Sequence, residues 1–139
     1  MINQHGESHV FDTTIGPCAI CWTREGVAAL HLPGPRGEAP SADPLTGWKP
    51  ARPPRPIKAV IERIRAHVGG TPRSFDDVAV DLGALPPFTR AVCEEARRIP
   101  CGQVRTYGEL ARAVGRPGGA RAVGQALGRN RLPVIIPCH

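Results

Sequence analysis

The sequence predicts an α+β fold, with antiparallel strands in the N-terminal part and short helices in the C-terminal part. Strand-like runs dominate the beginning of the chain, and apolar residues at helical spacing dominate its end. Charge divides in the same way: residues 1–85 hold nine Lys and Arg against nine Asp and Glu, whereas residues 86–139 hold nine Arg against three Glu. We therefore expect two domains, 1–85 and 86–139, and a polyanionic partner for the second.

Residues 9–32 contain three short strand-like runs separated by turn signals at residues 15–17 and 24–26. This spacing predicts an antiparallel meander. Eight of the 24 residues from Pro33 to Pro56 are proline, so we expect an irregular, Pro-rich excursion over residues 33–56 rather than packed structure.

Apolar residues recur at helical spacing after this excursion and stop at Gly69-Gly70, which predicts a helix. The apolar residues are Ile57, Val60, Ile61, Ile64 and Val68. The run DVAVDL, residues 77–82, then predicts a last short strand of the first domain.

Cys18 and Cys21 form a C-x-x-C pair within the strand-like run CAICW. No second pair and no His stands at the spacing that a zinc site needs, and residues three apart on a strand point to opposite faces. We expect buried core thiols and no metal. The sequence shows no signal segment and no apolar stretch long enough to cross a bilayer, so a cytoplasmic protein with reduced thiols and no membrane partner is expected.

Two helices are predicted at the start of the second domain. Residues 88–99 carry one apolar face and end at Pro100. The segment TYGELARAVG follows, with Thr106 and Glu109 at the spacing of a capping box and Gly115 as a C-terminal stop.

A third helix, ARAVGQALGRN, follows the turn at residues 116–119. Together with the helix TYGELARAVG before this turn, it resembles a helix-turn-helix. Ala120 and Gly124 have little or no side chain, so the backbone of a nucleic-acid duplex could approach this helix closely. Arg121 and Arg129 supply positive charge. Because glycine within a helix costs up to ~1 kcal/mol relative to alanine, Gly124 indicates a close contact.

The chain ends in PVIIPCH. The apolar run from Pro133 to Ile136 predicts a buried strand, which would present Cys138 and His139 at its end.

The stretch from Phe88 to His139 resembles the C-terminal domain of the alkylguanine-DNA alkyltransferases, the methylated-DNA–protein-cysteine methyltransferases. The elements RAVG, GRN and PCH carry the resemblance in this order. Residues 9–32 and 57–82 resemble the N-terminal lobe of that family more loosely. The resemblance implies a ribonuclease-H-like N-terminal lobe with antiparallel strands and a C-terminal domain of winged-helix or helix-turn-helix type.

The resemblance also implies a function in DNA repair. A member of this family binds double-stranded DNA, rotates a guanine alkylated on its exocyclic oxygen out of the stack, and transfers the alkyl group irreversibly to its own cysteine. This single-turnover methyltransferase needs no cofactor, and we expect it to act as a monomer.

Residue roles follow from the same resemblance. Cys138 would be the alkyl acceptor, with His139 as its first activating partner. Tyr107 would lie against the flipped base, and Asn130 would shape the hinge before the active-site strand. Arg121 would fill the gap that the base leaves, among the further DNA-binding residues of the third helix, namely Ala120, Gly124 and Arg129.

In the family, a Glu of the activation relay and a donor to the guanine oxygen come from a segment that follows the Pro-Cys-His motif. We therefore expect the sequence to be incomplete at the C-terminus, as a fragment or the product of a damaged gene. Three alternatives stay open: a non-enzymatic sensor of alkylated bases, an inactive fragment, and a thiol hydrolase or redox protein using Cys138 and His139. Neighbouring residues on a strand point apart, which disfavours the last of these.

Overall fold

The computed structural model describes residues 6–40, 45–100 and 103–136. The chain divides into two compact units, Met1–Asp81 and Leu82–His139, called the first and the second unit below. The first unit holds the sheet and one helix, and the second holds three helices, which confirms the predicted α+β class. Over the described residues, no helix is both long enough and apolar enough to span a bilayer.

The predicted meander is confirmed by three antiparallel strands, β1 (Glu7–Thr13), β2 (Gly16–Thr23) and β3 (Gly26–His31). Strand β2 is central and is buried on both faces from Cys18 to Trp22, as its run of apolar residues suggests. Gly26 begins β3 with φ +145°, and a Cβ atom there would lie 2.4 Å from the Ala79 carbonyl oxygen. Only glycine fits at this turn.

Both cysteines of the C-x-x-C pair are fully buried in β2, as predicted for core thiols. Burial raises the pKa of the Cys18 thiol, and a weak contact with the Thr13 hydroxyl offsets part of that rise. A raised pKa keeps this thiol protonated at neutral pH and therefore poorly nucleophilic.

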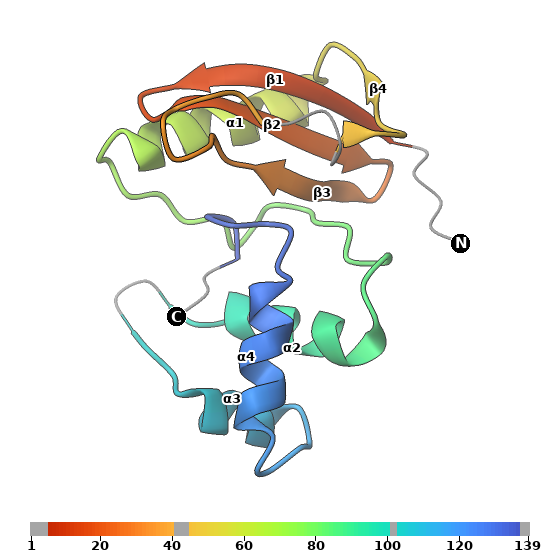
Figure 1. Ribbon diagram of the computed structural model, residues 1–139, viewed down its shortest axis with the longest axis vertical. Coiled ribbons are helices and arrows are strands. Elements are labelled where there is room, and N and C mark those ends of the chain that lie inside the picture. The colour runs from red at the N-terminus through yellow and green to blue at the C-terminus, as the bar shows by residue number, and fades with distance from the viewer. Residues whose placement is uncertain (1–5, 41–44, 101–102, 137–139) are drawn as a thin grey trace. The chain divides into compact units, whose positions relative to one another are not determined.

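The predicted helix of the first unit is α1 (Arg55–Val68), with proline in its first turn and Gly69 as its cap. Its apolar side, formed by Ile57, Val60, Ile61 and Ile64, is buried, and the helix lies along one face of the sheet (Figure 1). Near its C-terminal end, Arg65 Nε donates a 2.9 Å hydrogen bond to the Asp12 carbonyl oxygen. The Arg65 guanidinium also lies 5.7 Å from the centre of the Phe11 ring, so one side chain connects α1 to β1.

The prediction that residues 33–56 lack packed structure is wrong in part. Strand β4 (Lys49–Pro50) pairs in parallel with β1 and completes a sheet of order β3-β2-β1-β4. Beside it, the indole of Trp48 is 9% exposed and packs with Cys21 and Ala29. Burial of this large apolar ring stabilises the packing of the segment on the sheet, although the prolines keep most of its backbone irregular.

The prediction of a strand over residues 77–82 is also wrong. A turn closes at Phe75–Val78, and only Val80 forms an isolated parallel bridge, with Val27. The Val27 N–H donates to the Ala79 carbonyl at 2.9 Å, and the Asp81 N–H donates to the Val27 carbonyl at 2.8 Å. The preceding turn leaves too little extended chain for a longer ladder.

The three helices predicted for the second unit are confirmed as α2 (Pro87–Arg97), α3 (Tyr107–Ala113) and α4 (Ala120–Gly128). Helix α4 packs against both of the others, as Figure 1 shows. The buried apolar residues of these helices are Val92, Cys93, Ala96, Leu110, Ala111, Val123, Ala126 and Leu127.

Helix α3 begins with the predicted capping box. The Glu109 N–H donates to Thr106 Oγ1 at 3.0 Å, and the Thr106 N–H donates to Glu109 Oε1 at 2.7 Å. The bond from the Thr106 N–H lowers the pKa of the Glu109 carboxyl most, followed by the Thr106 hydroxyl, with smaller contributions from Arg105 and Arg112. The stabilisation of α3 by the ionised carboxylate is therefore present at neutral pH and is lost as the pH falls through the lowered pKa. At the other end, Gly115 takes the left-handed conformation with φ +82°, as expected of a C-terminal stop.

The prediction of a buried strand from Pro133 to Ile136 is wrong, because residues 133–136 form turns. The Asn130 side chain closes this loop: Oδ1 accepts the Leu132 N–H at 2.8 Å, and Nδ2 donates to the Ile136 carbonyl at 3.0 Å. Val134 adopts φ +75°, which is rare for a β-branched residue. The apolar side chains of Leu132, Ile135 and Ile136 are nevertheless buried, so the apolar run indicated burial correctly but not conformation.

Replacement of Thr106 should test the capping box. Thr106→Ala removes the acceptor of the Glu109 N–H and should lower the free energy of unfolding by about 1 kcal/mol. Hydrogen exchange of the α3 amides is the measurement. Thr106→Ser keeps the hydroxyl and should exchange as the parent does; equal effects of both substitutions would contradict a capping role.

Replacement of Asn130 should test the loop closure. Asn130→Ala leaves the Leu132 N–H and the Ile136 carbonyl without their side-chain partner, at a cost of about 1–3 kcal/mol. Urea unfolding measures the loss. The neighbouring variant Arg131→Ala changes an exposed side chain and should stay within about 0.5 kcal/mol of the parent.

Candidate functional site

The candidate site lies on the second unit, where α3 and α4 meet. Tyr107 is the first residue of α3, and its ring lies against the backbone of α4 at Gly124. A Cβ atom at Gly124 would lie 3.0 Å from Cε2 and 3.3 Å from Cδ2 of the ring. Tyr107 is 42% exposed, so its aromatic group rests on α4 and is also open to solvent.

Helix α4 has a buried side and an open side. Val123, Ala126 and Leu127 are buried, whereas Arg121 and Gly128 are exposed. Arg121 precedes Gly124 by three residues, and residues at this spacing are neighbours on the surface of a helix. The exposed arginine and the tyrosine ring therefore lie next to the same stretch of α4.

The arginines of the second unit fall into two groups. Some are held by the fold: Glu95 Oε2 accepts from Arg98 at 2.7 Å and Glu95 Oε1 from Arg105 at 3.2 Å. The Arg116 guanidinium lies 4.8 Å from the centre of the Phe88 ring.

The second group comprises Arg112 on α3 and the three residues Arg121, Arg129 and Arg131; its members are exposed and form no ion pair with any residue in the described ranges. The last three lie on α4 or directly after it. They place free positive charge along α4 and just beyond its C-terminal end, where it can attract an anionic polymer.

The structure brings together most of the site residues proposed from the sequence. Ala120, Arg121 and Gly124 lie on α4, and Tyr107 packs on it. Asn130 lies just after the helix, next to Arg129, and closes the loop up to residue 136. Two further proposed residues, Cys138 and His139, lie outside the described residues.

Sequence reasoning missed two contacts of this site. The close approach at Gly124 was expected from a nucleic-acid backbone, and its partner within the protein, the Tyr107 ring, was not foreseen. A glycine inside a helix signals a near neighbour but does not identify it. The bond from Arg105 to Glu95, which ties the segment before α3 to α2, was also missed, because a sequence spacing of ten residues carries no signal for such a pair.

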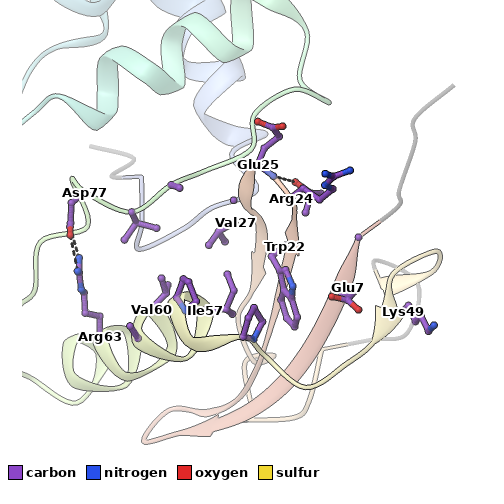
Figure 2. A pocket seen from close by; sticks show the side chains of 18 of the residues that line it. Glu7, Trp22, Arg24, Glu25, Val27, Lys49, Ile57, Val60, Arg63 and Asp77 are labelled. Carbon is purple, nitrogen blue, oxygen red and sulfur yellow. Dashed lines mark hydrogen bonds and ion pairs between the residues drawn. The ribbon is translucent and has the colours of Figure 1, made fainter.

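The first unit contains a separate cavity of about 970 Å³ (Figure 2). Apolar groups of Trp22, Val27 and Ile57 line it, and the Arg63 and Asp77 side chains form a two-pronged ion pair at its side. Acidic and basic side chains balance around it, and none of its described lining residues is Cys or His. No group of three or more His, Cys, Asp or Glu that could hold a metal occurs among the described residues. The cavity therefore offers neither a thiol nor an imidazole among its described lining residues.

Comparison with known proteins agrees with this view of the second unit. The DNA-binding domain of 6-O-methylguanine DNA methyltransferase, as a family model, matches residues 87–139. The methylated-DNA–protein-cysteine methyltransferase of Shigella flexneri is 44% identical over 78 residues, which cover 56% of this chain and 45% of the relative. The chain spans about half the length of the first curated relatives that it matches.

Solved structures of this kind are similar over nearly the whole chain. A variant of the Mycobacterium tuberculosis O6-methylguanine methyltransferase superimposes with a TM-score of 0.77 at 31% identity. The M. tuberculosis OGT in complex with DNA gives a TM-score of 0.74 at 32% identity. Each match covers 96% of this chain and 76% of the solved one. The chain therefore belongs to the family of methylated-DNA–protein-cysteine methyltransferases.

Proposed function

We propose that this protein repairs double-stranded DNA by transferring the alkyl group of an alkylated guanine to its own Cys138, once per molecule. The observation that carries the proposal is the grouping of a half-exposed Tyr107 ring, the backbone of Gly124 and the exposed Arg121 on one stretch of α4. The names of the relatives support the reaction, since they describe a protein cysteine that accepts a methyl group from DNA. One solved relative is a complex with DNA.

Binding to DNA is assigned to the second unit. Its net charge is positive, and Arg121, Arg129 and Arg131 are free to meet phosphates. Phosphate contacts of this kind release counterions, so the affinity falls as the salt concentration rises. Ala120, the first residue of α4, has a small side chain that lets a duplex come close to this end of the helix.

Extrusion of the damaged base is assigned to Arg121. Chemistry on a base inside a duplex requires the base to leave the stack, which costs roughly a few kcal/mol. A side chain that enters the vacancy offsets part of this cost, and a guanidinium can also donate hydrogen bonds to the orphaned partner base. Arg121 is exposed and close to Tyr107 along α4, so both can act on the same nucleotide.

Transfer itself is a displacement at the alkyl carbon. The Cys138 thiolate forms an S–C bond while the C–O bond to guanine breaks, and the electron pair of that bond passes to the base. His139 takes the thiol proton through a bridging water as a general base, and the leaving guanine takes up one proton in its place. Tyr107, donating a hydrogen bond to the base, stabilises the negative charge that develops on the leaving group. Water does not cleave the resulting thioether, so each molecule reacts once.

The loop that Asn130 closes leads directly to the acceptor. Asn130 holds the Ile136 carbonyl, two residues before Cys138, and the Leu132 N–H at the other end of the loop. We assign Asn130 to positioning the chain before the acceptor; it does not itself take part in the reaction.

Three other thiols are poor competitors for the alkyl group. Cys18, Cys21 and Cys93 are fully buried, so a base in DNA cannot reach them. The raised pKa of Cys18 also keeps it in the unreactive thiol form.

The acceptor can be identified by mass spectrometry. Incubation with a duplex that carries O6-methylguanine should add one methyl group per molecule, located on the peptide that contains Cys138, with no turnover beyond one equivalent. Cys138→Ser keeps the size of the side chain but lacks the thiol and should take up none. Methyl transfer to Cys18, Cys21, Cys93 or Cys101, or binding of the lesion without transfer, would reject the proposal; the last result would favour a lesion sensor.

We call the entry of the Arg121 side chain into the vacated space its finger role. This role can be tested with two substrates. Arg121→Ala should slow transfer from duplex DNA by about 10- to 100-fold, because the cost of extrusion is no longer offset. Transfer from the free alkylated base needs no extrusion and should change little. Arg98→Ala removes the same charge just after α2 and should slow neither reaction appreciably; equal losses on both substrates in Arg121→Ala would exclude the finger role.

A further inference from the structure

We propose that Gly124 is a positioning residue for Tyr107: because position 124 has no side chain, the phenol ring packs directly on the backbone of α4. We call this packing site the seat of the ring. The inference rests on the proposed function for its effect on transfer, but the seat itself is a property of the fold. It assigns Gly124 a partner within the protein, in place of the duplex backbone expected from the sequence.

The two glycines of α4 differ in what a Cβ atom would contact, and this difference shows that only one of them is a packing site for the ring. At Gly124 a Cβ atom would lie 3.0 Å from Cε2 and 3.3 Å from Cδ2 of Tyr107, closer than carbon atoms pack at rest. At Gly128, in the same helix, a Cβ atom would meet nothing within 4 Å. Both residues weaken the helix relative to alanine, but only Gly124 has a neighbour that requires the missing side chain.

If a methyl group is added at position 124, the Tyr107 ring has to move, because the backbone of Tyr107 is fixed. Tyr107 directly follows the N-cap of α3, where the Thr106–Glu109 capping box fixes the start of the helix. Helices α3 and α4 are also joined by buried residues such as Leu110 and Val123, which resist separation. Tyr107 is 42% exposed, so its ring has free space on the solvent side. Gly124→Ala should therefore leave the fold intact and rotate the ring away from α4.

Displacement of the ring matters because its hydroxyl must meet the leaving base. Hydrogen bonds weaken steeply with distance and angle, so a shift of the ring disturbs the donation that stabilises the leaving group. Misplacement of a reacting group by about 1 Å can cost about 100-fold in rate, and the smaller shift expected here corresponds to about tenfold.

Tyr107 is the only tyrosine of the chain, which allows the seat to be observed directly. In protein labelled with 3-fluorotyrosine, Gly124→Ala should shift or broaden the single ¹⁹F resonance, and the matched variant Gly128→Ala should not. Transfer from both the free alkylated base and the duplex should slow by about tenfold in Gly124→Ala only. Affinity for undamaged duplex should stay within about threefold of the parent in both variants, since neither removes a charge.

Thermal unfolding gives a second readout that needs no activity. With Tyr107 present, Gly124→Ala should raise the midpoint less than Gly128→Ala or should lower it. In a Tyr107→Ala background no ring meets the new methyl group, and Gly124→Ala should then raise the midpoint as Gly128→Ala does.

Three outcomes would overturn the inference. They are an unchanged fluorine signal in Gly124→Ala, a loss of DNA affinity with free-base transfer intact, and equal behaviour of the two glycine variants. A parent chain that transfers no alkyl group would instead refute the proposed function, and the fluorine signal and the unfolding cycle would still decide whether Gly124 seats the ring.

Discussion

The contact between the Tyr107 ring and the backbone of α4 is the constraint on which the candidate site depends. Helix α4 has to bury Val123 and Leu127 against its neighbours and also leave a bare stretch of backbone beside them. An ordinary amphipathic helix meets the first requirement, and only a glycine at position 124 meets the second. Helix α4 gives up intrinsic helix stability for this arrangement, and packing against α2 and α3 compensates.

Local signals in the sequence were enough to predict most of the regular structure. The apolar spacing of α1, the capping box of α3 and the glycines that begin β2 and β3 act within a few residues, so each could be recognised alone. Two of the three errors in secondary structure involve distant partners. Trp48 is buried by Cys21 and Ala29, and Val80 forms its single bridge to Val27, far away in the sequence. A pattern within one window contains no information about such partners.

The candidate site shows the same division between what the sequence reveals and what it hides. The unusual composition of α4 was recognisable from the sequence, because small residues and arginines rarely occur together on a helix that only packs in a core. Which arginines remain available was only partly predictable: Arg98 pairs with Glu95 three residues earlier, but Glu95 accepts a bond from Arg105 only after α2 and the segment before α3 have come together. The net positive charge of the second unit therefore overstates the charge that a partner meets on α4.

Closure of the loop by Asn130 has a consequence for how this segment is encoded. The path of a strand is determined by the neighbouring strand, whereas here one amide group bonds both ends of a five-residue stretch, at Leu132 and at Ile136. The bonds that determine the backbone path therefore come from residues of the segment 130–136 itself. Such a segment can be transferred as a unit: placed after another helix, with a pocket for its apolar side chains, residues 130–136 would fold along the same path.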